Sequence, residues 1–337
     1  GIIPPQEHLD AIERIAPTLR TLRHADGSLA RFHGGGRGVD GRLDQALSNS
    51  EVRHAAPDGL SMGFARLSGG RTSLVVDASV PPKDVSSHNA HASTLAFEMT
   101  SGRRPLIVNC GSGKVFGEDW RSAGRATQSH SVLSIDGYSS ARFAARGIKK
   151  RKLELLVDSP KHVPVQVSEA PDGTRLQAGH DGYDSTHGLT HARTLELTFN
   201  GRGLAGEDML LAMEDASKKR FEKRMDELSL QGVAFSIRFH LHPEVDAALD
   251  MGDTAVSIAQ KSGELWVFRH DGVAELSLEP SVYLEKGRLQ PRATKQIVLT
   301  GRAMDYATRI RWSLSKTQDT AVGVRDLVPD DEPQFLS

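Results

Sequence analysis

More than a dozen short segments of alternating apolar and polar residues follow one another between about residues 50 and 315. The glycines, prolines, asparagines and aspartates between them are typical of tight turns. A strand that alternates in this way buries one face only, so it needs a second layer to cover that face. The pattern therefore predicts a mainly β protein, a multilayer antiparallel β-sandwich. The expected strands are 63–67, 72–76, 94–99, 106–108, 131–135, 152–157, 163–167, 194–199, 233–241, 255–259, 264–268, 274–278, 295–299 and 310–314.

The residues before this region predict helices. Leucine and isoleucine recur at three- and four-residue steps over residues 5–24, which indicates one apolar helical face. Pro17 predicts a break or kink near Ala16, because proline removes a backbone donor inside a helix. A second short helix is expected at 41–48, and residues 210–227 are read either as a helix or as a solvated, highly charged loop. The two N-terminal helices are too short to bury a core alone, so they must pack on something else.

Composition excludes some functions and leaves others open. The formal net charge is −1, so the whole chain gives no electrostatic reason to expect nucleic acid or an anionic membrane as a partner. Acidic glycans stay possible, because a local basic patch can bind them whatever the net charge. No apolar run is long enough to span a membrane. The single cysteine, Cys110, cannot form an internal disulfide and is read as a packed small side chain.

Polar side chains gather where several expected strands begin or end, and they are the first candidates for a site. His88, Asn89 and His91 precede the strand at 94–99, Asn109 follows the strand at 106–108, and His130 precedes the strand at 131–135. Histidines from different strand ends can hold a metal ion together with a carboxylate. The alternative is that His91 and His130 are hydrogen-bonded core or interface residues. Spacing alone favours this second interpretation.

Two other histidine clusters are weaker candidates. His180 and Tyr183 lie in a glycine-containing stretch, read as a loop that could contact a sugar or serve acid–base chemistry. The alternative, which we favour for the neighbouring His191 and Arg193, is that they share one strand face and brace another strand. The histidines at 240 and 242 also share a strand face, where lining a polar surface is favoured over binding a metal. The stretch 111–114, Gly-Ser-Gly-Lys, is similar to part of a phosphate loop, but it lacks the first glycine at the right spacing and no helix is expected after it.

Three stretches occur in a fixed order: Asn-Ala-His-Ala-Ser at 89–93, Arg-Pro-Leu-Ile-Val-Asn-Cys-Gly at 104–111, and Arg-Ala-Thr-Gln-Ser-His at 125–130. In this order the sequence resembles the heparinase II/III-like polysaccharide lyase family. Members of that family carry His-Ala-His-Ala-Asp, then Arg-Pro-Leu-Leu-Val-Asp-Pro-Gly, then Arg-Ser-Thr-x-x-His. Segments 180–183, 191–193 and 238–243 also match, so the resemblance runs from about residue 50 to residue 315.

The resemblance implies a particular domain organisation. Family members have an N-terminal (α/α) toroid followed by stacked antiparallel β-sheets, a supersandwich. It thus implies that residues 1–48 are a helical remnant of an upstream toroid, that 49–320 form the β-sandwich domain, and that 321–337 are a tail. The chain does not begin with methionine, and this also suggests that the toroid of the same protein lies upstream.

The resemblance also implies an activity, β-elimination at a uronic acid. That reaction needs a group to neutralise the carboxylate, a base and an acid. By the family pattern Asn89 stands at a catalytic histidine position, where it cannot transfer protons, and His88 is the only neighbouring substitute. Arg125, together with His180 and Tyr183, is the expected substrate-binding set. One divalent metal, most simply zinc, would be held by His91, Asn109 and His130, with Asn109 replacing an aspartate.

Two functions follow. In the first, the parent protein is a polysaccharide lyase that cleaves a uronic-acid-containing glycan, and this chain alone is inactive. In the second, the chain is a non-catalytic carbohydrate-binding or structural β-sandwich module. Both imply an acidic polysaccharide as partner, with no nucleic acid and no membrane, and the substrate class suggests a periplasmic location. Oligomeric state and the identity of the glycan do not follow from the sequence.

Overall fold

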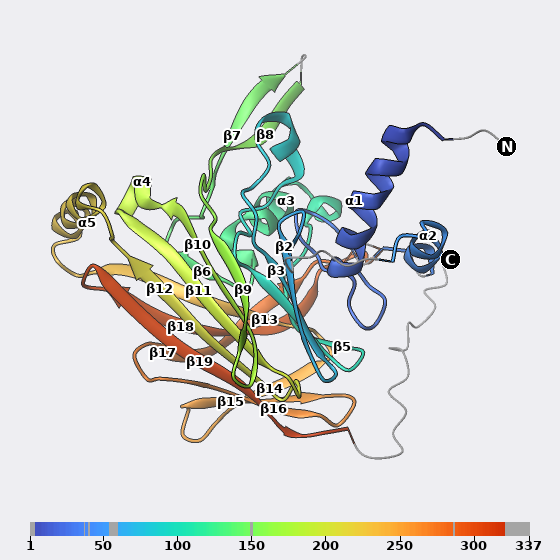
Figure 1. Ribbon diagram of the computed structural model, residues 1–337. Coiled ribbons are helices and arrows are strands. Elements are labelled where there is room, and N and C mark those ends of the chain that lie inside the picture. The colour runs from blue at the N-terminus through green and yellow to red at the C-terminus, as the bar shows by residue number, and fades with distance from the viewer. Residues whose placement is uncertain are drawn as a thin grey trace.

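The computed structural model describes residues 4–36, 38–39, 41–53, 60–148, 151–285 and 287–320, and the predicted tail lies outside these ranges. Within them the chain is mostly β, as predicted, and short helices precede two large antiparallel sheets (Figure 1). Every predicted strand overlaps a strand of the structure. The division at residues 48 and 49 stays a prediction.

The first sheet has nine strands in the described residues, in the order β1-β2-β3-β4-β5-β13-β18-β17, and β6 also pairs with β13. Their bounds are β1 Leu60–Ser61, β2 Phe64–Gly69, β3 Thr72–Asp77, β4 Phe97–Ser101, β5 Arg104–Val108, β6 Leu133–Ile135, β13 Val233–Leu241, β17 Glu275–Tyr283 and β18 Arg292–Ala303.

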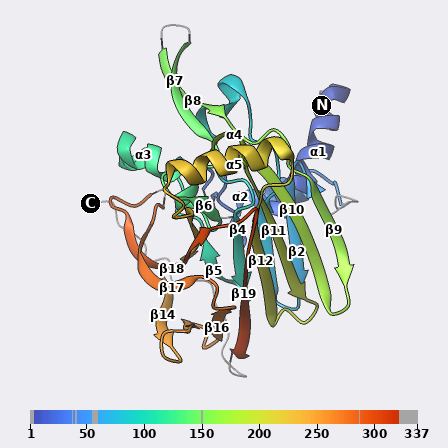
Figure 2. The same ribbon diagram turned by 90° about the vertical axis from the view of Figure 1, so that its left-hand side faces the viewer.

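The second sheet has eight strands over the same ranges, in the order β14-β15-β16-β19-β12-β11-β10-β9. Their bounds are β9 Val165–Ala170, β10 Gly173–Tyr183, β11 Leu189–Thr198, β12 Gly203–Leu211, β14 Val245–Asp250, β15 Ala255–Gln260, β16 Leu265–His270 and β19 Ala307–Gln318. A separate hairpin, β7 (Arg142–Ile148) with β8 (Arg151–Asp158), projects away from both large sheets (Figures 1 and 2).

The helical segments lie around the sheets. Their bounds are α1 Gln6–Leu22, α2 Arg42–Asn49, η1 Asp84–Asn89, η2 Lys114–Phe116, α3 Glu118–Arg125, η3 Thr127–Ser129, α4 Asp184–His187 and α5 Asp215–Glu227. The helix expected over 210–227 is α5, which begins later because residues 210 and 211 end β12. No helix of the described residues is long and apolar enough to cross a membrane.

The first helix has no break at the expected place, because α1 is continuous through Pro17. Proline leaves the carbonyl of the residue four positions earlier without its helical donor. That residue is Glu13, which is exposed, so water can satisfy its carbonyl. Thr18 Oγ1 also donates to the carbonyl of Arg14, at 3.2 Å. The missing backbone donor is therefore compensated locally.

An aromatic cluster joins the two sheets. Phe97 of β4 and Phe239 of β13 come from the first sheet, and Phe268 of β16 and Trp312 of β19 come from the second. The ring of Trp312 stacks on Phe97 with centroids 6.0 Å apart and meets Phe239 edge-on at 4.6 Å. All four side chains are at most 3% exposed, so the core of the sandwich lies between the sheets.

Gly206 of β12 makes room for this cluster. It pairs with Trp312 across the β12–β19 ladder, and a Cβ at Gly206 would lie 2.1 Å from the indole ring. We expect Gly206→Ala to lower the free energy of unfolding by about 1–3 kcal/mol, because the buried indole must move. Gly147→Ala on β7 is the control, since a Cβ there meets nothing within 4 Å. Urea unfolding compares the two, and equal stabilities would contradict this close approach.

Candidate functional site

Helix α3 and the short helix η1 are fastened together by two arginines one helical turn apart. Arg121 Nη2 donates to the carbonyl of His88 at 2.8 Å. Arg125 donates from Nε to the carbonyl of Ala90 at 2.8 Å and from Nη2 to that of Ser87 at 3.0 Å. The arginines therefore fix the backbone that carries the predicted residues Asn89 and His91.

A pocket of about 280 Å³, which we call the η1–α3 pocket, opens beside this junction. Its lining is rich in cations and contains no aspartate or glutamate of the described residues. The lining residues are His33, Gly34, Gly35, Asn89, His91, Ser112, Lys114, Arg121 and Arg125. Such a lining attracts an anionic group and offers it several donors.

The two arginines share the counter-ion Glu154, outside the lining, and Arg121 also lies 3.6 Å from the exposed carboxylate of Glu118. Glu154 of β8 accepts from Arg125 Nη1 at 2.7 Å and lies 3.4 Å from Arg121 Nη1. Burial, and then the charge of Arg121, lower the pKa of Arg125 to about 10, so Arg125 stays charged at neutral pH. Lys114 is exposed, and no ion-pair partner lies beside it in the described part of the chain. The pocket is therefore net positive.

His91 is directly hydrogen-bonded to His130, with 3.0 Å between His91 Nδ1 and His130 Nε2. His130 Nδ1 donates to the carbonyl of Ala126 at 2.8 Å, so His130 Nε2 carries a lone pair. The shared proton therefore belongs to His91 Nδ1. Burial lowers the pKa of both imidazoles, that of His130 to about 4, and both are neutral at pH 7.

These residues do not fit a zinc site. His91 Nδ1 and His130 Nε2 are hydrogen-bonded to each other, so these two nitrogens are not available to a metal ion. The third expected ligand, Asn109, is a neutral amide whose Oδ1 accepts the backbone N–H of Ser131 at 3.0 Å. The amide nitrogen of Asn109 is buried and lacks a hydrogen-bond partner among the described residues. Across the described part of the chain, no group of three or more His, Cys, Asp or Glu is placed to hold a metal ion. Structural zinc favours closed sets of four ligands with anionic members.

We expect purified chain to contain substoichiometric zinc, measured by plasma mass spectrometry after gel filtration. Asn109→Asp should raise the zinc content, because a carboxylate would join the two imidazoles. His130→Ala in the same background is the control and should remove the gain. Stoichiometric zinc in the unaltered chain would contradict the prediction.

His33 attaches the N-terminal segment to the pocket. Its Nδ1 accepts the backbone N–H of His91 at 3.1 Å, and its Nε2 lies 3.2 Å from Asp77 Oδ2. Burial opposes charge on His33, but the neighbouring Asp77 raises its pKa. The ring therefore links the backbone of His91 to a buried carboxylate of β3.

The structure brings together three of the predicted site residues, Asn89, His91 and Arg125, in this pocket. Asn89 is exposed at the pocket, whereas His130 and Asn109 are fully buried. His88 is outside the lining, and its Nδ1 accepts from Arg121 Nη2 at 3.2 Å. The His88 ring therefore braces an arginine and does not face the pocket.

His180 and Tyr183 do not line the η1–α3 pocket. We expected them to contact substrate, but their burial contradicts this expectation. Both are 0% exposed, at the end of strand β10 and not in a loop. His180 Nδ1 accepts from the backbone N–H of Gly182 at 3.0 Å, so its Nε2 donates to His191 Nδ1 at 3.3 Å. His191 Nε2 in turn bonds Asp208 at 2.8 Å. These groups serve the core, as the favoured interpretation of His191 and Arg193 predicted.

The remaining histidine pair and the cysteine are also interior groups. His240 and His242 are at most 8% exposed, so the polar sheet face that they were expected to line is a buried one. Cys110 Sγ lies 3.5 Å from His240 Nδ1, and burial raises the pKa of the thiol to about 11. Cys110 is therefore an unreactive packed side chain, as predicted.

Three basic lining residues were not among the predicted site residues. Lys114 ends the Gly-Ser-Gly-Lys stretch, which was discounted for want of a following helix, yet η2 and α3 follow it. Arg121 stands four residues before Arg125, and that spacing would have indicated a shared helical face. His33 carries no comparable signal, because its partner Asp77 is distant in sequence.

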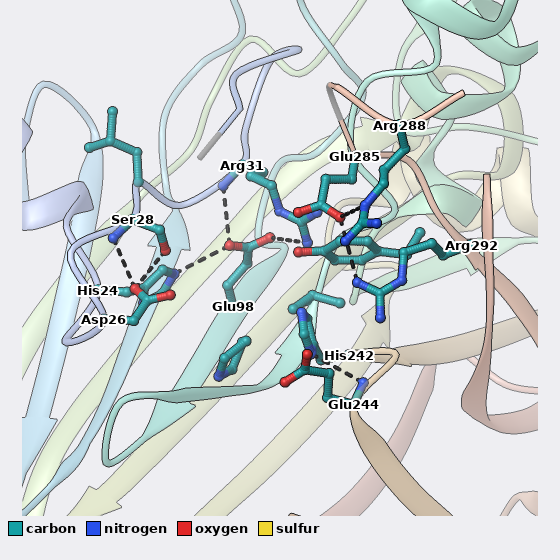
Figure 3. Close-up of a pocket in the computed structure, with 14 residues that line it drawn as sticks. His24, Asp26, Ser28, Arg31, Glu98, His242, Glu244, Glu285, Arg288 and Arg292 are labelled. Atoms are coloured by element: carbon teal, nitrogen blue, oxygen red, sulfur yellow. Dashed lines mark hydrogen bonds and ion pairs between the residues drawn. The ribbon is translucent and has the colours of Figure 1, made fainter. Parts of the chain in front are cut away.

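Figure 3 shows a second pocket, of about 60 Å³, around the buried carboxylate of Glu98. Glu98 accepts from the backbone N–H groups of Arg31 and Asn109, at 3.1 and 2.9 Å, and lies 3.3 Å from His24 Nε2. Burial opposes its ionisation, but Arg31 and the other donors lower its pKa to about 2. The other charged side chains include Glu285, paired with Arg288 and Arg292. Because carboxylates and cations alternate, this pocket is a structural ion cluster.

Comparisons with known proteins agree with this architecture. A sequence profile described as "Heparinase II/III-like, C-terminal" matches residues 51–313. FtsZ-localized protein C of Caulobacter vibrioides is 30% identical over 321 residues, covering 93% of this chain and 53% of that protein. The chain thus spans about half the length of this curated relative.

Solved structures of lyases share the fold. A heparan sulfate lyase HepC mutant from Pedobacter heparinus has a TM-score of 0.68 at 13% identity, covering 94% of this chain and 48% of that one. A heparinase III, the BT4657 gene product, has a TM-score of 0.67 at 14% identity, covering 94% and 48%. Since the profile matches most of the chain, the protein belongs to the heparinase II/III-like family and represents its C-terminal β-sandwich domain.

Proposed function

We propose that this chain binds an acidic polysaccharide in the η1–α3 pocket and does not itself break the glycan. The observation that carries the proposal is the lining, in which the exposed Lys114 and Asn89 can donate to a ligand, the buried Arg121 and Arg125 add positive charge, and no described carboxylate is present. Charged donors of this kind neutralise the carboxylate or sulfate of a uronic-acid glycan.

The same lining supports binding over proton transfer. β-Elimination needs a base beside the neutralised carboxylate and an acid for the leaving oxygen. Asn89 can donate a hydrogen bond but cannot exchange a proton at neutral pH. His91 is 2% exposed, its Nδ1 is engaged with His130, and its Nε2 lies 3.5 Å from where a Cβ of Gly34 would stand. A polymer therefore has little access to its imidazole.

A lyase activity of the longer parent protein is compatible with this proposal. The family membership and the fold of the lyase structures support it, and the remaining half of the parent would then supply the acid and base. The curated relative is named for localisation to FtsZ and not for a lyase activity, which supports the non-catalytic alternative.

The deciding experiment incubates this chain and its full-length parent with a panel of uronic-acid polysaccharides. Calorimetry measures binding, and ultraviolet absorbance detects the unsaturated uronate left by β-elimination. Binding by both proteins, with absorbance rising for the parent alone, supports a lyase whose other half carries the chemistry. Binding without any rise supports the non-catalytic module, and absence of binding by this chain overturns the proposal.

Lys114→Ala is the sharpest variant of the pocket, because Lys114 is exposed and its removal leaves the arginine network intact. We expect about tenfold weaker binding of the acidic glycan, the loss of one charged hydrogen bond. Lys219→Ala is the matched control, since Lys219 is an exposed lysine of α5 that does not line the pocket. Equal affinities of the two variants in calorimetry would count against the pocket.

A further inference from the structure

A larger pocket lies at the other end of η1. It has a volume of about 680 Å³ and lies between the start of η1 and the β7–β8 hairpin. Its lining residues are Lys83, Asp84, Val85, Arg146, Gly147, Leu155, Leu156, Val157, Asp158, Ser159 and Lys161. We call it the hairpin pocket, after the hairpin that projects beside it (Figures 1 and 2).

The hairpin pocket carries unpaired positive charge. Lys83, Arg146 and Lys161 are exposed, and none has an ion-pair partner in the described part of the chain. Of the two lining carboxylates, Asp158 is already paired with Arg142, at 3.2 Å. Three cations therefore face one free carboxylate, that of Asp84, and the excess charge must be solvated or meet an anion.

The hairpin pocket also has apolar lining residues. Val85 and Val157 are 54% and 39% exposed, and the buried Leu155 also contributes to the lining. A sugar ring presents C–H groups on its faces and charged groups at its edge, so a lining that combines apolar and cationic side chains suits an acidic sugar. The described lining contains no aromatic side chain, which single-stranded nucleic acid would use for stacking.

One short helix spans the distance between the two pockets. Lys83 and Asp84 stand at its start and Asn89 at its end, and its six residues extend about 12 Å at about 2 Å per residue. A polymer that places one acidic sugar in the η1–α3 pocket can therefore reach the hairpin pocket within a few sugar units.

We propose that the hairpin pocket is a second subsite for the same acidic polysaccharide, so that the glycan crosses η1 with anionic groups held at both ends. This inference rests on the proposed function of the η1–α3 pocket. It specifies the ligand as a chain of several acidic sugars, because a single uronate fills one pocket only. The two pockets then act as linked sites, and binding to one raises the local concentration at the other.

The experiment compares the affinity of the chain for a long ligand with its affinity for a short one. Calorimetry with heparan sulfate, hyaluronate and polygalacturonate identifies a polymer that binds, and its disaccharide is then measured beside it. The double variant Lys83→Ala/Lys161→Ala should bind the polymer about tenfold more weakly and with a shallower salt dependence, because two exposed charge contacts are lost. It should bind the disaccharide as the unaltered chain does.

Lys114→Ala and Lys219→Ala complete the set. Lys114→Ala should weaken both ligands, and Lys219→Ala should weaken neither. If the double variant binds the polymer normally while Lys114→Ala does not, the second subsite is wrong and the proposed function stands. If no polymer binds the unaltered chain, both fail. Tighter binding of single-stranded DNA than of any polysaccharide, lost in the double variant, would overturn the ligand class. Circular dichroism confirms that each variant is folded.

Discussion

Asp208→Ala should lower the free energy of unfolding by about 3–5 kcal/mol, the usual effect of removing one partner of a buried ion pair. Arg193 Nε and Nη2 donate to the carboxylate of Asp208 at 2.8 and 3.0 Å, Trp312 Nε1 donates at 2.9 Å and His191 Nε2 at 2.8 Å. All of these groups are buried. Without the carboxylate, the guanidinium stays in the core with no counter-charge.

Arg193 also joins the two halves of the sandwich. Its strand, β11, belongs to the second sheet, while its Nη1 donates to the carbonyls of Leu95 and Ser131, both at 2.9 Å, in the segments that lead into β4 and β6 of the first. The Arg193–Asp208 pair therefore sets how the sheets meet.

Glu207→Ala provides the matched control for Asp208. Glu207 is the preceding residue of β12 and pairs on the outer face with Arg311, at 3.2 Å, where both side chains are partly exposed. Its loss should change the free energy of unfolding by less than about 1 kcal/mol. Urea unfolding measures both variants. Similar values for the two would mean that the buried network contributes no more than a surface pair.

The alternation of apolar and polar residues predicted the sandwich, but it missed strands whose sequences do not alternate clearly. Strand β10 contains three glycines and a His-Asp-Gly-Tyr stretch, which are typical of a loop. Its place in the sheet depends on partners outside the segment. His180 pairs with His191 across the β10–β11 ladder, and such a contact, between residues eleven apart with a strand end and a helix between them, has no local signature.

Strand β12 was missed for a similar reason. Gly206 weakens its strand propensity, and the indole of Trp312, from the distant strand β19, explains a glycine there. The break expected at Pro17 is absent because helix stability depends on tertiary packing and on solvent access to one carbonyl. The periodicity of apolar residues in the sequence carries no information on tertiary packing or on the exposure of a single carbonyl.

The sequence likewise predicted some residues of the candidate site and missed others. The family resemblance indicated Asn89, His91 and Arg125, which lie together in the structure. Lys114 and Arg121 were not identified because α3 was not expected, so neither the spacing of its arginines nor the preceding lysine had a structural context. The resemblance could not reveal that His91 and His130 bond to each other, because that contact follows from tertiary packing.

The second large effect is that of pH, and we expect the chain to unfold as the pH falls from about 6.5 towards 5. His130, His240 and His242 are buried, and burial lowers their pKa values to about 4, 3 and 3. In the unfolded chain each imidazole takes up a proton near pH 6.5. Because the folded state binds fewer protons below that pH, stability is fully present above pH 6.5 and decreases as the pH falls.

The magnitude follows from the same three groups. At pH 5 each stands about 1.5 pH units below its unfolded pKa, which is about 2 kcal/mol each and about 6 kcal/mol together. The pKa values of His91, His180 and His191 are lowered as well and add to the loss. A domain whose stability lies at the lower end of the typical range of about 5–15 kcal/mol would then be largely unfolded near pH 5.

Urea titrations between pH 8 and pH 5 test this expectation against the ordinary route of acid unfolding, the protonation of carboxylates. Glu98, with its pKa near 2, loses its contribution only below its unfolded value of about 4.5, so its effect begins at lower pH. Three neutral buried histidines predict a slope that approaches about 4 kcal/mol per pH unit between pH 6 and 5. A free energy of unfolding that stays constant down to pH 4.5 would show that these imidazoles accept protons in the folded state, and would contradict their burial as neutral groups.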